Sequence, residues 1–309
     1  MSTQQSQDGQ RRHRSAVLQA LLVAFLWATS WVLIKIGLRE APPLPFAGLR
    51  YSLAFVLLLP WVARRRYAQQ LSQLSRRSWL ELGALGLLLY SLTQGAQFFA
   101  LSELPAVTVN LLLSFSTIAV ALLAIGLLHE RPRALQWVGV LLALLGALLY
   151  FWPLVVPAAQ AAGYGAAAIG VLSNAGASIL GRHINRRETL SPLLVTVVSM
   201  GIGSVILLTT GWIAQPLPPL SLRAWAIIGW LAAVNTAFAF TLWNHTLRTL
   251  SAVESSIING TLLIQIPILA VVFLGETINI HQVVGLLVAA VGSLLVQVRR
   301  RAKPPQPAR

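Results

Sequence analysis

Long apolar runs separated by short charged or proline-containing breaks constrain this chain more than any other feature. Ten runs of about 20 residues follow one another, at about 16–36, 44–63, 79–101, 105–128, 134–152, 161–181, 192–213, 224–247, 252–275 and 280–298. They are continuously apolar rather than alternating, which excludes a β-barrel. With only 10% charged residues, a chain of 309 residues also lacks the polar surface that a soluble protein needs. We therefore predict an all-α integral membrane protein with ten transmembrane helices.

Basic residues fall mostly on one side of this predicted topology. Of the 23 Lys and Arg residues, only Lys35, Arg39, Arg50 and Arg223 lie on the side opposite the N-terminus. The positive-inside rule then places both termini of this multi-pass protein in the cytoplasm. The same asymmetry explains the net charge of +15 without a nucleic-acid partner, so the partner that we expect is the lipid bilayer.

The chain contains an internal repeat. A shift of 146 residues aligns residues 104–150 with 250–296 without a gap, and it pairs Glu130 with Glu276 and Gly139 with Gly285. Each half holds five spans, an odd number, so the second half enters the membrane from the opposite side. Inverted repeats are typical of secondary transporters, with a solute site near the midplane and alternating access.

The predicted organisation follows from these two patterns. It comprises a basic cytoplasmic tail (1–15), a first five-helix repeat (16–152), an external linker (153–160), a second five-helix repeat (161–298) and a second basic cytoplasmic tail (299–309).

Several sequence patterns resemble one known family. FLWATSWVLIK in the first span, GLRYSLAFVLLL in the second, LSELPAVTVNLLLSF before the fourth, and Gly-Glu at 275–276 are similar to the EamA-type transporters of the drug/metabolite transporter superfamily. The resemblance implies a ten-helix inner-membrane carrier of amino acids, metabolites or toxic organic compounds, often an exporter. Family members commonly carry a proline within the fourth and ninth spans. Here the ninth has Pro267, whereas the aligned residue in the fourth is Ala121.

Polar side chains at bilayer depth are functional candidates, because they are costly there unless they face a cavity or a partner. Tyr90, Gln94 and Gln97 in the third span are spaced i, i+4 and i+7 and share one helix face. We predict that this stripe binds substrate. The alternative is hydrogen bonding between helices without a substrate.

The first span places Trp27, Trp31 and Lys35 on one face, at i, i+4 and i+8. Two indoles and a nearby cation would suit aromatic or amphipathic substrates that carry a carboxylate. The alternative is lipid-facing tryptophan with a snorkelling lysine. Arg50, near the outer end of the second span, has the same two interpretations.

Single amides in four other spans complete the predicted substrate-binding set, and two carboxylates are candidates for a gate. The amides are Asn110, Asn174, Asn235 and Asn259. Glu130 and Glu276 lie at the loop ends of equivalent helices, where each would act as a gate or proton site, or else as a capping or ion-pairing carboxylate.

Small residues form matching stripes in the fifth and tenth spans. These are Gly139, Ala143 and Ala147 in one span and Gly285, Ala289 and Ser293 in the other. Close packing of helices is the expected role, and a homodimer seam is the alternative.

The sequence argues against an enzyme. It has no cysteine and no HExxH, and its five histidines lie in the tail or near span ends, so no base is available at the midplane. We expect no catalytic residues, no metal and no cofactor. The prediction is a secondary transporter that exports small organic metabolites. The alternative, a non-transporting receptor or scaffold, does not explain the duplication.

Overall fold

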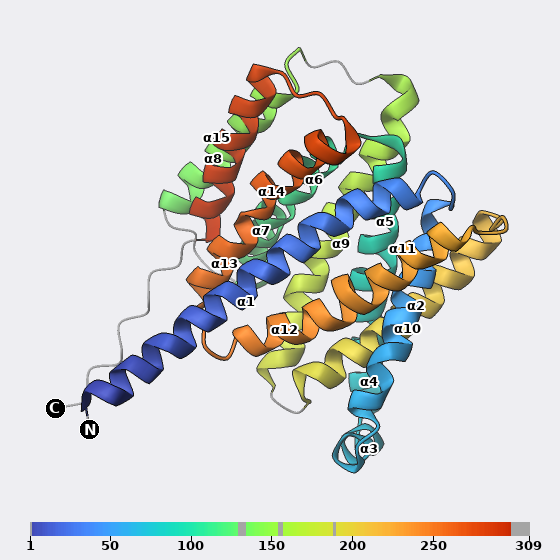
Figure 1. The fold of residues 1–309 in the computed structure, drawn as a ribbon, viewed down its shortest axis with the longest axis vertical. Helices are drawn as coiled ribbons and strands as arrows, with labels where there is room; N and C mark the ends of the chain where they lie inside the picture. The colour runs from blue at the N-terminus through green and yellow to red at the C-terminus, as the bar shows by residue number, and fades with distance from the viewer. Residues whose placement is uncertain (1, 129–133, 154–156, 188–189, 298–309) are drawn as a thin grey trace.

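The computed structural model describes residues 2–128, 134–153, 157–187 and 190–297, and every regular element in these ranges is helical. Nine of the described helical segments are long and apolar enough to cross a membrane, and α8 (Ala134–Tyr150) is a shorter apolar helix at the predicted fifth span. The predicted all-α membrane fold is confirmed, and ten spans agree with the helices present (Figure 1).

The helices follow the order of the predicted spans. The first half contains α1 (Ser2–Gly37), α2 (Pro43–Val62), the third span α4 (Arg76–Gly86), η1 (Leu87–Thr93) and α5 (Gln94–Glu103), the fourth span α6 (Ala106–Ser114) and α7 (Ser116–Leu128), and α8. The second half contains η2 (Ala158–Gln160) and α9 (Ala161–Arg186), α10 (Pro192–Ala214), the eighth span α11 (Leu222–Ala232), η3 (Ala233–Phe238) and α12 (Ala239–Thr246), the ninth span α13 (Ala252–Gly260), α14 (Leu262–Leu269) and η4 (Ala270–Leu274), and α15 (Ile280–Gln297). η1, η3 and η4 are π-helical.

Two helical regions were not expected from the apolar runs. Residues 2–15, predicted as a tail, continue α1 as helix, because Gln and Arg are good helix formers and no proline interrupts them. His13 on this extension lies 3.0 Å from the carboxylate of Glu254. The short helix α3 (Arg65–Ser72) lies between the second and third spans, with Tyr67 buried. We call the end of the bundle that holds α3 the N-terminal end, and the opposite end the distal end.

Glu254 illustrates how helix starts at the N-terminal end are capped. Its carboxylate accepts hydrogen bonds from the backbone and hydroxyl of Ser251, while the Ser251 hydroxyl accepts from the Glu254 backbone. The bonds from Ser251, backbone first, hold the pKa of the Glu254 carboxyl below its ordinary value.

The repeat is visible in the irregularities of the backbone. The π segments η1 and η3 begin at Leu87 and Ala233, and the fourth and ninth spans break at Phe115 and Thr261; both pairs are separated by the same 146 residues as the sequence repeat. At each break the backbone N–H bonds the carbonyl three residues back, at 3.1 Å. Because the first-half break contains no proline, Pro267 is not required for a break at this position.

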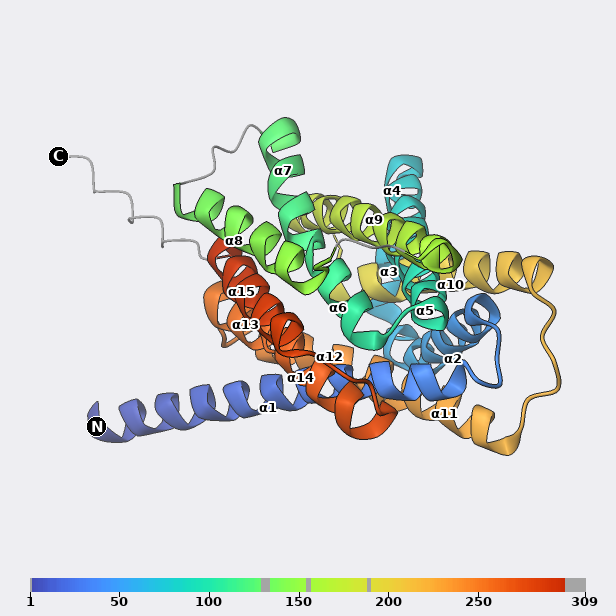
Figure 2. The same ribbon diagram turned by 90° about the horizontal axis from the view of Figure 1, so that it is seen from above.

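The two halves interlock. α1 packs against α12 and α14 of the second half, and α9 packs against α5 and α7 of the first half. α2 and α10 pair with each other, as do α8 and α15 (Figures 1 and 2). Each repeat therefore buries its first helix against the other repeat, and the bundle cannot be separated into two independent five-helix domains.

The small-residue stripes pack against each other inside the chain. A Cβ added to Gly139 would lie 2.7 Å from the Gly292 carbonyl oxygen, and one added to Gly285 would lie 2.6 Å from that of Gly146. Only glycine permits this approach of two backbones. The face that was considered as a homodimer seam is thus covered by α8 against α15 within one chain.

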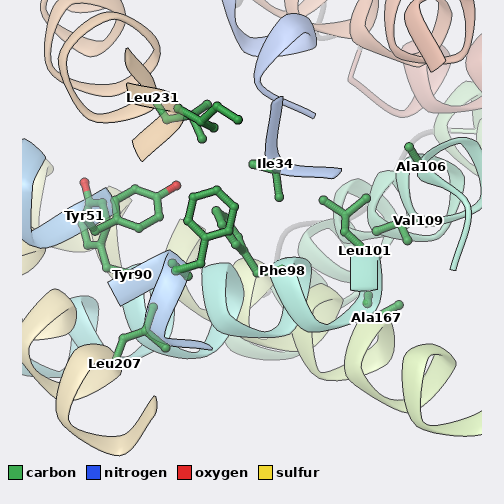
Figure 3. Packing of buried hydrophobic residues seen from close by; sticks show 14 of the residues in the cluster. Ile34, Tyr51, Tyr90, Phe98, Leu101, Ala106, Val109, Ala167, Leu207 and Leu231 are labelled. Atoms are coloured by element: carbon green, nitrogen blue, oxygen red, sulfur yellow. The ribbon is translucent and has the colours of Figure 1, made fainter. Parts of the chain in front are cut away.

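The largest buried cluster lies where α2, the third span and the eighth span meet. Tyr51, Tyr90 and Phe98 gather there, with Leu231 across from them and Ile34 of α1 nearby (Figure 3). α2 and the third span belong to the first half and the eighth span belongs to the second, so the cluster lies at the interface between the repeats.

Candidate functional site

Arg50 is the central charged residue of this interface. It lies seven residues into α2 and only 4% of it is exposed. Its Nε donates a hydrogen bond of 3.1 Å to the hydroxyl of Thr236, which is fully buried in η3 of the other repeat. The guanidinium thus joins the two halves inside the membrane-spanning part of the protein.

Aromatic rings surround the guanidinium. Its Cζ lies 5.0 Å from the ring centroid of Tyr51 and 5.9 Å from that of Phe98, distances typical of cation–π interactions. Tyr51 packs edge-on against Tyr90 at 5.7 Å, and Phe98 packs edge-on against Phe46 at 5.2 Å. We call Arg50, Tyr51, Tyr90, Phe98 and Thr236 the central cluster.

The two π segments carry residues of this cluster. Tyr90 lies in η1 and Thr236 in η3, at positions 146 residues apart, so they are equivalent in the two repeats. The Thr236 hydroxyl donates to the carbonyl of Leu231, five residues back, and Thr93 makes the same kind of bond to Leu88. These bonds satisfy carbonyls in the widened turns. One repeat contributes an aromatic phenol at this position and the other a small hydroxyl, so the interface is asymmetric.

Asn235 borders the central cluster on the side of α1. Its side-chain amide is fully buried and donates to the Leu26 carbonyl and, at 3.2 Å, to the Thr29 hydroxyl. Its Oδ1 atom is buried without a hydrogen-bond partner in the described part of the chain. A buried acceptor of this kind is unusual and could accept a hydrogen bond from a solute.

Trp27 and Trp31 both lie on the protein side of α1, so neither is a purely lipid-facing residue. Trp27 packs against Phe240 at 5.6 Å and Trp243 at 5.1 Å, and Trp31 packs against the main buried cluster. Phe240 and Trp243 are the repeat equivalents of Gln94 and Gln97. The same helix face is therefore aromatic in one half and polar in the other.

The predicted stripe in the third span does not keep ideal α-helical spacing. The π turn η1 ends between Tyr90 and Gln94 and widens the turn that joins them. Tyr90 is buried in the central cluster, whereas Gln94 and Gln97 are half-buried on α5. Of this stripe, the structure thus brings only Tyr90 into the central cluster, where it packs against Tyr51.

The other predicted amides differ in their surroundings. Asn110 of α6 is buried and donates a long bond of 3.4 Å to the carbonyl of Leu262, next to the break in the ninth span. Asn174 is half-buried on α9, and Asn259 is exposed on α13. The structure does not bring Asn259 into contact with the central cluster.

Lys35 and Glu276 lie together at the distal end, where they stabilise two helix termini. Lys35 Nζ donates to the carbonyls of Leu101 and Leu104, both at 2.6 Å, at the C-terminus of α5. Glu276 accepts from the backbone N–H groups of Ala106 at 2.6 Å and Val107 at 3.1 Å, at the N-terminus of α6. Each charge has the sign that the helix dipole favours. Lys35 is therefore bound inside the protein rather than snorkelling to the membrane surface.

A small cavity adjoins these two caps. It has a volume of about 200 Å³, and its lining includes Lys35, Arg39, Leu101, Ser102 and Glu276. Glu276 belongs to the second repeat and the α6 backbone to the first, so this contact joins the repeats at the distal end. Glu130, its predicted counterpart, lies outside the described residues.

Three residues of the central cluster were not among the sequence candidates: Tyr51, Phe98 and Thr236. Thr236 had a signal in the sequence, because it is the repeat equivalent of Tyr90. Tyr51 adjoins Arg50, but neighbouring residues on a helix point in different directions and adjacency alone did not indicate a shared site. Among the described residues, no group of three or more His, Cys, Asp or Glu side chains could hold a metal ion.

Comparison with known proteins identifies the family. The EamA-like transporter family matches residues 14–152 and, separately, residues 161–298. The chain belongs to the EamA-like transporter family. The family consists of transporters rather than enzymes, and its two matches correspond to the two halves of the bundle. The predicted resemblance is therefore confirmed, and the chain is a multi-pass membrane transporter.

Individual relatives share about a quarter to a third of their residues with this chain over the aligned regions. An "Uncharacterized transporter" of Archaeoglobus fulgidus is 36% identical over 128 residues, which cover 41% of this chain and 43% of that protein. A "Probable amino-acid metabolite efflux pump" of Salmonella typhimurium is 25% identical and covers 92% of this chain and 96% of its own length. A solved crystal structure superposes with a TM-score of 0.66 at 17% identity and covers 91% of this chain and 97% of its own, so the two share a fold.

Proposed function

We propose that this EamA-family transporter is a secondary carrier that exports small organic metabolites, with amino acids and amphipathic or toxic compounds as the substrate class. It works by alternating access, in which the two inverted repeats expose a site between them first to one side of the membrane and then to the other.

The observation that carries this proposal is the pair of π segments, η1 and η3, that border the central cluster from opposite repeats. Distorted helices at a repeat interface are a recurring feature of transporter binding sites, since they free backbone groups and admit local bending. Here the distortions lie one repeat apart and beside a buried cation. We propose that Trp27, Trp31, Tyr90, Gln94, Gln97, Asn110, Asn174 and Asn235 line the path of the solute. Asn259 has the least support, because it is exposed.

The distal contact supports a gate. Because Glu276 of the second repeat caps a helix of the first, separation of the repeats at this end requires that both of its hydrogen bonds break. We propose that this contact is intact when the distal end is closed. Lys35 of α1 lies at the C-terminus of α5, just before the turn into α6, and its positive charge attracts the Glu276 carboxylate at the start of α6.

Direction and orientation rest on two further arguments. The relative from Salmonella typhimurium is named as an efflux pump, which favours export. The concentration of Lys and Arg on one side favours an inner-membrane orientation with both termini in the cytoplasm. The distal end would then face outward.

Counterflow into proteoliposomes tests the carrier function. Vesicles that contain the full chain are loaded with a pool of unlabelled amino acids and metabolites and diluted into a trace of the labelled pool, with protein-free vesicles as the control. We expect transient accumulation of label, and splitting the pool then identifies the solute. Folded protein that gives no accumulation above the control with any pool would contradict the proposal.

A further inference from the structure

The central cluster holds a positive charge without a fixed negative partner. The carboxylates whose side chains the structure describes are Glu40, Glu81, Glu103, Glu254 and Glu276, and all of them lie at the ends of the bundle. Glu81 pairs with Arg77 and Arg187, and Glu254 with His13. None of the described carboxylates pairs with Arg50, which lies about 10 Å along α2 from its start.

A buried guanidinium in this setting is costly. Removal of a charge from water is compensated only when a partner of opposite charge or a full set of hydrogen bonds replaces the water. The flat rings of Tyr51 and Phe98 and the single hydrogen bond to Thr236 replace part of the lost hydration. The hydrogen-bonding capacity of the guanidinium that these contacts leave unused points to a role beyond structure.

The geometry leaves a specific part of Arg50 available. Nε is occupied by Thr236, whereas Nη1 and Nη2 make no hydrogen bond within the described residues. These two nitrogens form the end of the planar fork that matches the two oxygens of a carboxylate. The bond through Nε fixes the orientation of the plane, so the fork is positioned before any ligand arrives.

The neighbouring groups suit the rest of such a ligand. The phenol hydroxyls of Tyr51 and Tyr90 make no hydrogen bond within the part of the chain that the structure describes, and both rings are buried. The other neighbouring side chains are apolar: Phe46, Phe98 and Leu231 belong to the same buried cluster, and Figure 3 shows Phe98 and Leu231 beside the two tyrosines. A single guanidinium with phenols and apolar walls fits a singly charged carboxylate attached to an apolar or aromatic group better than a multiply charged anion.

We propose that the central cluster is an anion subsite in which Arg50 binds the carboxylate of an organic acid or amino acid, with Thr236 as a positioning residue. This proposal rests on the carrier function proposed above and specifies its substrate class. The carboxylate would supply the negative charge that the fold omits, so the positive charge favours the loaded form of the carrier.

The test compares acids with their amides on the purified full chain in lipid nanodiscs. Thermal unfolding is followed with the twenty L-amino acids and with acetate, butyrate, benzoate and phenylacetate, each beside its carboxamide. A ligand of the folded state raises the midpoint in a saturable way. We expect at least one acid to do so, with its amide about tenfold or more weaker, because the amide cannot pair with the guanidinium as an anion.

Variants of Arg50 test whether the preference for acids over amides depends on this residue. Arg50→Gln should lose the preference for the acid, and Arg50→Lys should keep a weakened preference, because it retains the charge without the fork. Arg223→Gln is the matched control, since it removes an exposed arginine near the distal end, and it should behave like the wild type. If Arg50→Gln does not fold, the comparison of acids with amides on the wild type and on Arg50→Lys still tests whether Arg50 binds the carboxylate.

Four results would overturn the proposal: no acid of the panel stabilises the wild type, amides act as well as acids, Arg50→Gln binds the acid as tightly as the wild type, or inorganic phosphate stabilises where no carboxylate does. The carrier function is judged separately by counterflow. Counterflow of a neutral or cationic solute that Arg50→Gln retains would leave the carrier in place and remove the subsite. Acid binding that depends on Arg50, without counterflow of any solute, would support the subsite and contradict the carrier function.

Discussion

Thr236 shows how one side chain can set the geometry of a charge in the membrane. Its hydroxyl uses its proton on the Leu231 carbonyl and its lone pair on Arg50 Nε, so it is fixed from both sides. A hydroxyl that is held in this way is a directional acceptor. Without it, the guanidinium would keep its aromatic contacts but lose its fixed orientation.

We predict that Thr236→Val weakens binding of a carboxylate ligand about fivefold, since a hydrogen bond of this kind contributes about 1 kcal/mol. The measurement is the ligand-dependent shift of the unfolding midpoint. Thr241→Val is the control: Thr241 is an exposed residue of α12, and its hydroxyl bonds only the Ala237 carbonyl within the same span. A Thr236→Val protein that is less stable but binds with unchanged affinity would show that the bond is only structural.

At the scale of the residue, the sequence predicted the presence of Arg50 and Tyr90 but not their arrangement. Thr236 was missed because threonine in a membrane helix usually bonds its own backbone, and it does so here in addition to accepting from Arg50. Lys35 was predicted as a charge near the outer end, but its partners are backbone carbonyls, which leave no trace in the side-chain pattern.

At the scale of the element, the contact between α8 and α15 depends on glycine. A Cβ on Gly146 would lie 2.5 Å from the Gly285 carbonyl oxygen and closer still to the backbone of Ala289. Since backbone atoms cannot rotate away as a side chain can, the two helices would have to move apart.

We therefore expect Gly146→Ala to destabilise the protein by about 1–3 kcal/mol, the usual cost of overpacking. Gly83→Ala is the control, because a Cβ there has nothing within 4 Å and alanine favours helix. Thermal unfolding of the two variants in detergent should separate them, with the Gly83 variant at or above the wild type. Equal midpoints for both variants would contradict the packing argument.

The cap that Glu276 places on α6 predicts a second effect. Glu276→Gln retains the shape of the side chain but removes the charge that faces the helix dipole and Lys35, so the distal end should open more often. The chain has no cysteine, so a single Leu101→Cys can report accessibility: Leu101 is fully buried and adjoins the distal cavity.

A membrane-impermeant maleimide should label Leu101→Cys faster in the Glu276→Gln background than with Glu276 intact. Glu103→Gln, which removes an exposed carboxylate at the same end of α5, should leave the rate unchanged. Equal labelling in all three backgrounds would argue that the cap does not restrain the distal end.

The element order was largely predictable because apolar runs of membrane length are a strong signal. The π segments were not, since a widened turn has no side-chain period of its own and depends on tertiary packing. The helical start of α1 was missed for a different reason: polarity marked residues 2–15 as outside the membrane, but polarity does not prevent a helix from continuing into water. Pro267 drew attention to the ninth span, yet the break lies at Thr261 and recurs at Phe115 without a proline.

At the scale of the whole molecule, the distribution of charge predicts orientation. A reporter that fluoresces only in the cytoplasm should be active when fused after the C-terminus, and a phosphatase that is active only outside should be active when fused after Leu217, between α10 and α11. Phosphatase activity at the C-terminus would reverse the topology and place the distal end in the cytoplasm.

The interlocked halves also set a requirement for transport. α1 packs against the second repeat and α9 against the first, so any movement of one repeat relative to the other must change contacts between them. Under the proposed alternating access, the distal contact between Glu276 and α6 would open once in every transport cycle.

The most direct test locks this contact. Ser102 of α5 and Leu274 of η4 line the distal cavity from opposite repeats, and in a chain without cysteine they can be replaced together as Ser102→Cys and Leu274→Cys and joined by a short, cleavable cross-linker. Counterflow of the solute identified in proteoliposomes should stop on cross-linking and return after cleavage, while each single variant should be unaffected by the reagent. Counterflow at the wild-type rate in fully cross-linked protein would contradict alternating access between the repeats.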